Sequence, residues 1–152
     1  DFNTLKQWTE DFYNSNRALF INRIKSKKIR DCHGDLHMEH ICLTENLSIF
    51  DCIEFNNRFR YTDTLADIAF LLMDLEYYGG NTLSKKLWDL YKEIAQEHDL
   101  NSLLAFYKIY RAIVRGKVNS FQLDDANIGM EKKEEAIETS SRYFKLARSY
   151  IE

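Results

Sequence analysis

Residues 65–75 read LADIAFLLMDL, a nearly continuous apolar run. An amphipathic surface helix carries one apolar stripe, whereas this run would present apolar side chains on nearly every side of a helix. A globular domain can accommodate such a helix only at its centre. Gly79-Gly80 follows the run and would stop the helix. The run therefore predicts a central helix around which the rest of the chain packs.

The segment before this run predicts a helix and a hairpin. Apolar residues from Thr4 to about Lys28 fall near helical spacing, and the basic cluster at 25–28 suits the negative end of a helix dipole. We therefore expect one long amphipathic helix there. The short runs Ile41–Leu43 and Ser48–Phe50 flank Glu45-Asn46 and predict two strands around a tight turn. This hairpin is the β structure that the pattern supports.

The segment after the central run predicts three more helices. Asn81-Thr82 and Asn101-Ser102 are N-cap signals for helices over about 82–97 and 102–121. A last, charged helix is expected over about 130–150. The expected order is one helix, a small hairpin and four helices, in one domain over residues 1–152. The predicted class is α+β and mostly α-helical.

Length and composition exclude several classes of protein. The 152 residues suffice for one ordinary domain, and 45% hydrophobic residues place the chain outside the disordered class. There is no apolar run of about 20 residues for a membrane span. The net charge of −3 gives no electrostatic footprint for nucleic acid or an anionic bilayer. We therefore expect neither nucleic acid nor a membrane as a main partner.

The cysteines indicate the compartment. Cys32, Cys42 and Cys52 fit neither a disulfide framework nor a four-thiolate zinc site, so a reducing cytoplasm is expected. The chain has no signal-peptide pattern and no initiator methionine. The sequence is thus compatible with a piece of a longer protein.

Polar side chains of catalytic type concentrate in residues 32–40, which read CHGDLHMEH. Any single residue there is more often structural, but a second cluster, DCIEFN at 51–56, follows the predicted hairpin. The hairpin would bring both clusters to one end of its strands. Four side chains could then converge on one divalent cation, namely Asp35, His40, Asp51 and Glu54. Phosphoryl transfer needs such a set, with a carboxylate for the attacking hydroxyl and ligands for Mg²⁺.

Three ordered motifs resemble the aminoglycoside phosphotransferase and choline kinase-like families, which are relatives of protein kinases. Residues 33–37, HGDLH, resemble the catalytic loop, and Ile53-Glu54-Phe55 resembles the metal-binding triplet. Residues 67–70, DIAF, resemble the start of the central helix. With residues 106–112, the chain looks most like an uncharacterised bacterial branch that is sometimes fused to a P-loop kinase-like domain. The resemblance matches the C-terminal lobe of that fold.

The resemblance implies a role for each motif residue. Asp35 would be the catalytic base and His33 a packed residue that shapes the loop. His40 stands where the family has Asn as a metal ligand, and imidazole suits Mn²⁺ better than Mg²⁺. Glu54 would be the main ligand of Mg²⁺ or Mn²⁺, with Asp51 as the competing choice. ATP would lie between this lobe and an N-terminal lobe, and an unknown small molecule would accept the phosphate.

Other charged residues have structural or substrate-binding interpretations. Asp67 is expected to cap the central helix and to tie its start to the catalytic loop. Arg60 and Asp63 follow the metal cluster, where a local ion pair is favoured over contact with substrate. Three cations share one side of a predicted helix, namely Lys108, Arg111 and Arg115. Such stripes are usually solvated surface, and the alternative is a cleft that receives an anionic substrate.

Three functions stay open at this point. The first is the C-terminal lobe of a small-molecule kinase, which would be inactive or nearly so on its own. The second is a kinase-like binding or scaffolding domain without catalysis. The third is a zinc metallohydrolase that uses His33, His37, His40 and Asp35. Without its N-terminal lobe, such a domain would expose an apolar patch, so self-association is also expected.

Overall fold

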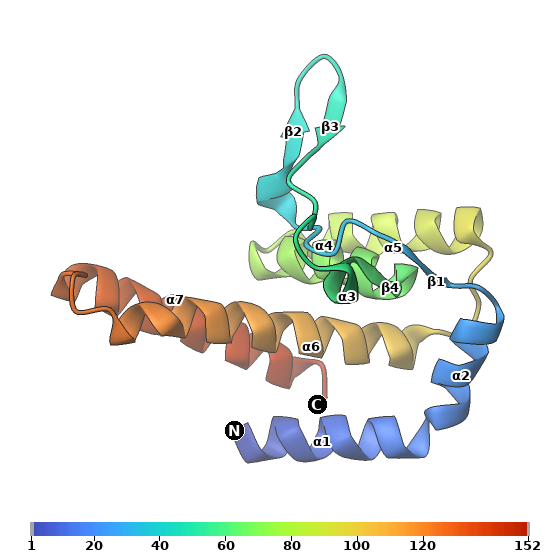
Figure 1. Cartoon of the computed structure of the whole chain (residues 1–152), viewed down its shortest axis with the longest axis horizontal. Helices are drawn as coiled ribbons and strands as arrows, with labels where there is room; N and C mark the ends of the chain where they lie inside the picture. Colours follow the sequence, from blue (N-terminus) through green and yellow to red (C-terminus); the bar gives the residue numbers. More distant parts are fainter. Residues whose placement is uncertain (1, 152) are drawn as a thin grey trace.

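The computed structural model describes residues 2–151, in which helices dominate and two small two-stranded sheets are present (Figure 1). The α-helices are α1 (Phe2–Ser15), α2 (Arg17–Lys25), α3 (Asn57–Arg60), α4 (Thr64–Tyr77), α5 (Asn81–Ala95), α6 (Asn101–Ser120) and α7 (Met130–Ser149). The strands are β1 (Ile29–Asp31), β2 (Ile41–Leu43), β3 (Leu47–Ile49) and β4 (Tyr61–Asp63). Two short 3-10 helices are η1 (Met38–His40) and η2 (Phe121–Asp124). The predicted class, α+β and mostly helical, is confirmed.

The central helix is α4, as the apolar run predicts. Every residue from Leu65 to Leu75 is buried. On one side, α4 packs against Trp88 of α5 and Leu103 of α6. Phe70 belongs to a second apolar cluster, with Tyr143 of α7. Each fully buried large apolar side chain contributes about 1.5–3 kcal/mol, so α4 holds the domain together from both sides.

The N-cap of α4 is Asp63, and the predicted cap at Asp67 is wrong. The Asp63 carboxylate accepts a hydrogen bond from the backbone N–H of Leu65 at 2.9 Å. Asp67 lies one turn further into the helix and is 9% exposed. Its carboxylate serves the neighbouring loop instead, as described below.

The expected long first helix is broken at Asn16. The side-chain amide of Asn16 donates a hydrogen bond to the carbonyl of Phe12 at 2.8 Å, and its backbone leaves the helical conformation at φ −117°. Asn competes in this way with the backbone hydrogen bonds of a helix. The turn carries Arg23 of α2 to two buried acids, Asp63 and Glu97, which it contacts at 2.6 and 2.7 Å. The break thus closes a buried ion-pair network.

A second sheet was not expected from the sequence. Strand β1 pairs antiparallel with β4, and Arg30 lies opposite Thr62. Each strand has three residues, and about thirty residues separate them. The sequence therefore shows neither an alternation of apolar and polar residues nor a tight turn that would predict the pairing. Asp31 and Arg60 form an ion pair across this sheet. The prediction that the hairpin is the β structure of the chain is therefore wrong.

The predicted hairpin is confirmed, although β3 begins one residue earlier than expected. Ile41 lies opposite Ile49, and Leu43 lies opposite Leu47. The hairpin projects from the helical body, as Figure 1 shows. Leu43 and Leu47 are 83% and 65% exposed. The hairpin therefore presents apolar side chains to its surroundings.

The three last helices follow the predicted ranges to within two residues, but the caps predicted for the first two are wrong. Asn81 and Asn101 are the first residues of α5 and α6, and the N-cap positions belong to Gly80 and Leu100, which provide no capping side chain. The amide oxygen of Asn101 instead accepts a hydrogen bond from the Trp88 indole at 3.3 Å. Helices α6 and α7 lie side by side (Figure 1). Within residues 2–151, no helix has both the length and the apolar character needed to cross a membrane.

Candidate functional site

Two carboxylates of α4 hold the histidine-rich loop. Asp67 accepts hydrogen bonds from the backbone N–H groups of His33 and Gly34 at 2.9 and 3.0 Å. Asp74 accepts one from the N–H of Met38 at 2.9 Å. Residues seven apart lie on one face of a helix, so both acids face the loop. Asp67 holds its beginning, and Asp74 holds its end at Met38. The expected tie between Asp67 and the loop is confirmed, whereas Asp74 was missed, although both acids interrupt the apolar run of α4.

Gly34 gives the loop its shape. Its φ of +82° is a left-handed conformation that favours glycine. A Cβ at this position would lie 3.0 Å from the carbonyl oxygen of Phe59 and 3.1 Å from a side-chain carbon of Ile53. The turn directs two successive N–H groups to Asp67 and leaves Asp35 at the edge of a cleft.

His33 joins this loop to the end of the hairpin. Its Nε2 lies 2.7 Å from the carbonyl oxygen of Phe50, and its Nδ1 accepts a hydrogen bond from the N–H of Asp35. A carbonyl only accepts, so Nε2 carries the hydrogen. The backbone N–H of Ile53 also donates to the His33 carbonyl at 2.9 Å. Both polar clusters are therefore brought together, and His33 acts as a structural link.

His40 lies between two acids. Its Nδ1 is 2.8 Å from the carbonyl oxygen of Asp35, and its Nε2 is 3.3 Å from the carboxylate of Asp51. Because the carbonyl only accepts, Nδ1 carries the hydrogen, and Nε2 of a neutral ring is left as a lone-pair donor. The His40 ring lies 4.0 Å from that of buried His37, which fixes its position. His40 therefore directs a metal-binding nitrogen towards Asp51.

Asp35 is poised as an ionised carboxylate. Its side chain is 41% exposed, and one of its oxygens lies 3.5 Å from Nε2 of His37. The polar contact with His37 lowers the pKa of Asp35 below its usual value against the opposing effect of burial, and His40 and Arg111 lower it further. Asp35 thus stays ionised, and able to accept a hydrogen bond, at neutral pH.

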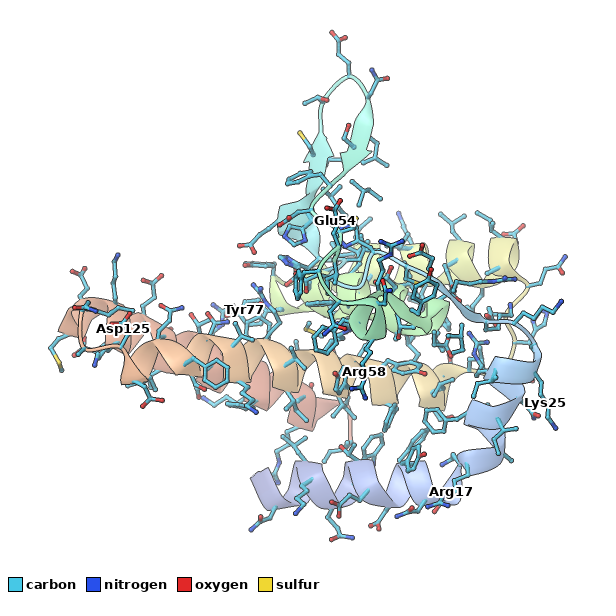
Figure 2. All side chains as sticks on the ribbon, viewed as in Figure 1. Arg17, Lys25, Glu54, Arg58, Tyr77 and Asp125 are labelled. Carbon is cyan, nitrogen blue, oxygen red and sulfur yellow. The ribbon has the colours of Figure 1, made fainter. Side chains whose placement is uncertain are left out.

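Asp51 and Glu54 occupy different positions. Asp51 has a φ of +61°, a strained conformation outside glycine, and lies beside His40. Glu54 follows the root of the hairpin (Figure 2) and is exposed, with no hydrogen bond or ion pair to any other described residue. The geometry therefore pairs Asp51 with His40, in contrast to the preference for Glu54 from sequence spacing.

A cleft of about 1110 Å³ opens beside these residues. Its lining includes the acids Asp35, Asp51 and Glu54 and residues of α6, among them Phe106, Tyr107 and Arg111. The exposed Arg58 of α3 lies at another edge (Figure 2). The cleft exceeds the usual range for small-molecule sites, about 300–1,000 Å³. The three candidate acids thus face one space.

The predicted substrate-binding cations have different partners in the structure. Arg60 forms an ion pair with Asp31 rather than with Asp63, and it does not line the cleft. Lys108 binds Glu76 at 2.5 Å. These two cations are engaged in structural pairs.

The other two cations of the predicted stripe also differ from each other. Arg115 donates to the hydroxyl of Tyr143 at 3.4 Å and lies 3.5 Å from Glu39. Arg111 lines the cleft and is 9% exposed. The interpretation of the stripe as solvated surface is wrong for Arg111, because α4 covers it through Phe70.

A second possible metal site lies in the histidine-rich loop itself. One ligand atom each from Asp35, His37 and His40 lies within 4.8 Å of the others. Nδ1 of His40 lies 3.8 Å from the carboxylate of Asp35, and that nitrogen is hydrogen-bonded to the Asp35 carbonyl. His33 is engaged at both nitrogens, so the predicted set of three histidines does not assemble.

Comparison with known proteins relates the chain to one segment of longer proteins. Uncharacterized protein Rv2004c of Mycobacterium tuberculosis is 32% identical to it over 149 residues. Uncharacterized protein Mb2027c of Mycobacterium bovis is similar to the same extent. The match covers 97% of this chain and 29% of each relative, so the chain spans less than a third of their length. No family model and no solved structure matches the sequence.

Proposed function

We propose that this chain is the catalytic half of a divalent cation-dependent phosphotransferase that moves the γ-phosphate of ATP to an acceptor hydroxyl. One observation carries the proposal: His40 links the Asp35 loop to Asp51, and both carboxylates line one cleft. A base and a cation site must be adjacent in phosphoryl transfer, because catalysis depends on positioning and on charge stabilisation. The kinase-like C-terminal lobe inferred from the motifs is part of this proposal.

The cation would be held by His40 Nε2 and Asp51. The nitrogen and the carboxylate lie 3.3 Å apart, and the Asp51 side chain is 74% exposed, so an ion has access to both. A mixed nitrogen and oxygen set suits Mn²⁺ and tolerates Mg²⁺ with added water. When bound, the cation would neutralise charge on the phosphates. Glu54 lines the same cleft and is the alternative carboxylate ligand for the cation.

Asp35 would orient the acceptor hydroxyl and take its proton. Its lowered pKa keeps it ionised, and its half-exposed carboxylate is accessible from the cleft. The loop behind it is held by Asp67 and by Asp74. Such fixed placement of a reacting group is a large part of catalysis in this reaction class.

The remaining parts of the proposed enzyme would come from the longer parent protein. A kinase-like N-terminal lobe would supply a glycine-rich loop and a strand lysine for the nucleotide phosphates. The relatives are more than three times as long as the matched segment, and the hairpin beside the site exposes Leu43 and Leu47. The isolated chain should therefore transfer phosphate slowly or not at all. A non-catalytic scaffold has the same fold but needs no cation at His40.

A zinc hydrolase is the second candidate, favoured by the spacing of Asp35, His37 and His40. It differs from the phosphotransferase in that it uses the buried His37 as a ligand. Metal analysis of the purified chain separates the candidates. Stoichiometric zinc that is lost in His37→Ala would favour the hydrolase, whereas exchangeable Mn²⁺ that depends on Asp51 favours the phosphotransferase.

The test uses a matched pair of carboxylate variants. Asp51→Asn and Glu54→Gln each remove one negative charge from the same cleft. Mn²⁺ binding to the chain is measured by water proton relaxation. We expect Asp51→Asn to weaken binding at least tenfold and Glu54→Gln less than threefold. Equal effects of the two variants, or no saturable Mn²⁺ binding, would count against the cation site.

A further inference from the structure

Arg111 is a buried cation without an acidic partner. It lies on α6, is 9% exposed, and places its guanidinium 4.7 Å from the ring centre of Phe70. Its Nε has no hydrogen-bond acceptor within residues 2–151. No described carboxylate lies within ion-pair distance of it either, although its side chain lines the cleft.

The contrast with Arg23 shows that this arrangement is unusual for the fold. Arg23 is 5% exposed and contacts both Asp63 and Glu97 with paired hydrogen bonds. Buried charges are ordinarily paired in this way, because an unpaired ion loses its hydration without compensation. Burial accordingly lowers the pKa of Arg111. A group from outside this part of the chain would complete its hydrogen bonds.

The neighbouring acids do not fill this role. Asp67 uses its two carboxylate oxygens on the backbone N–H groups of His33 and Gly34. The nearest contacts of Asp35 are with His37 and His40. The N–H donors of Arg111 are therefore available to a ligand in the cleft. A guanidinium binds a carboxylate or a phosphate with two parallel hydrogen bonds.

We propose that Arg111 binds an anionic group, carboxylate or phosphate, of the acceptor, which is therefore an anionic hydroxy compound. This inference rests on the proposed function for the role of the ligand as acceptor. The position of Arg111 favours the acceptor over the nucleotide. It lines the cleft from α6 near Asp35, the proposed base, whereas the nucleotide phosphates belong with the cation at His40 and Asp51.

The cleft also sets the character of the rest of the acceptor. Phe106, Tyr107 and Tyr110 flank Arg111 on the same helix and line the same space. Such walls suit an apolar or aromatic body next to the anionic group. A sugar without charge would leave the guanidinium unsatisfied, and a polycation would meet it with repulsion.

The test measures binding of simple anions to the wild-type chain by nuclear magnetic resonance. Inorganic phosphate and acetate are titrated separately at constant ionic strength, with chloride as the reference, and the Arg111 Nε–H resonance is followed. We expect a saturable shift of that resonance with one or both probes, and the tighter probe identifies the anionic group. No shift of the Arg111 resonance at saturating concentrations of either probe would overturn the proposal.

Variants give a second, independent result. Arg111→Met should weaken binding of the effective probe at least tenfold, and Arg111→Lys, which keeps the charge but loses the fork, at least threefold. Lys85→Gln removes an exposed cation on α5 and should leave binding unchanged. A folded Arg111→Met chain that binds the probe as wild type does would contradict the role of Arg111.

A third variant separates this inference from the proposed function. Asp35→Asn should keep or strengthen anion binding, because it removes a nearby negative charge, while it abolishes phosphate transfer in the parent protein. Retained anion binding together with unaffected transfer would reject Asp35 as the base and leave the Arg111 site standing. If Asp35→Asn loses anion binding at Arg111 and also abolishes phosphate transfer, the anion site at Arg111 is rejected and the role of Asp35 as the base stands.

Discussion

The carboxylate of Asp67 accepts the backbone N–H of Gly34 at 3.0 Å, which fastens the candidate catalytic loop to the most deeply buried helix of the domain. The same carboxylate holds the N–H of His33. The position of Asp35, one residue further on, is therefore set by α4. Rigidity of the base follows from the core rather than from the loop itself.

Asp67→Ala should loosen this loop. Hydrogen bonds to charged groups contribute about 1.5–3 kcal/mol each, and the variant removes two of them, so we expect a loss of about 3–6 kcal/mol in the free energy of unfolding. Chemical denaturation measures the loss, with the exposed Asp124→Ala as control. A change below about 0.5 kcal/mol, which is typical of surface substitutions, would show that Asp67 does not anchor the loop.

Gly34→Ala should destabilise the domain more than alanine at a second left-handed glycine. Gly79 has a φ of +83° and open space at its Cβ position, so Gly79→Ala isolates the conformational penalty, about 1–2 kcal/mol. Gly34→Ala adds the contact with the Phe59 carbonyl at 3.0 Å. Thermal unfolding compares the two variants. Equal losses of stability would indicate that the loop yields without strain.

The two buried arginines should respond in opposite ways to methionine. Arg23→Met leaves Asp63 buried without an ion-pair partner and leaves Glu97 with Lys28 alone, and breaking a buried pair costs about 3–5 kcal/mol. Arg111→Met removes a cation that has no acidic partner among the described residues, so we expect a change within about 1 kcal/mol or a gain in stability. Urea denaturation measures both. A loss of stability in Arg111→Met as large as in Arg23→Met would reveal a structural role for Arg111.

Acid should destabilise the domain partly through Glu97. Burial raises the pKa of Glu97, but hydrogen bonds from Arg23 and Lys28 outweigh it, so the pKa is lowered in the folded state. The group then stabilises the fold above its unfolded pKa of about 4.3, and this contribution is lost as pH falls through the folded value. Glu97→Gln should flatten the fall of melting temperature below about pH 4.3, because it removes that titration. Glu93→Gln, an exposed change in the last turns of α5 shortly before Glu97, should not.

The exposed hairpin should drive self-association of the isolated chain. Leu43 and Leu47 lie opposite each other and are mostly exposed. Exposed apolar patches promote association, and threonine removes apolar surface while its β-branched side chain suits a strand. Sedimentation velocity over a range of concentrations should show weaker association for the double variant Leu43→Thr, Leu47→Thr. If the wild-type chain stays monomeric at every concentration, the exposed hairpin does not drive self-association.

The parts of the fold that are encoded locally could be predicted from the sequence. Helix α4 has apolar residues on every side, and the β2–β3 hairpin has two short runs around polar residues, so each is visible within one window. The β1–β4 sheet joins three-residue strands that lie far apart, and such pairing leaves no local pattern. The break at Asn16 rests on a side-chain hydrogen bond to the Phe12 carbonyl that apolar spacing does not reveal.

The sequence predicted which residues form the candidate site, but it did not predict how they pair. Asp35 and His40 follow from the clustered motif, and the structure brings them together. The pairing of His40 with Asp51 instead of Glu54 depends on a positive φ that residue spacing does not reveal. Helical periodicity grouped the cations of α6, but their partners on other elements distinguish Arg111 from Lys108.

The most direct test of the central claim is nucleotide turnover by the complete parent protein. ATP hydrolysis or transfer is measured with Mg²⁺ or Mn²⁺, and the wild type is compared with Asp35→Asn. Because a positioned base contributes about 10²–10⁴-fold, we expect turnover that requires the cation and falls at least a hundredfold in Asp35→Asn. Turnover that Asp35→Asn leaves unchanged would contradict the assignment of Asp35 as the base of a phosphotransferase.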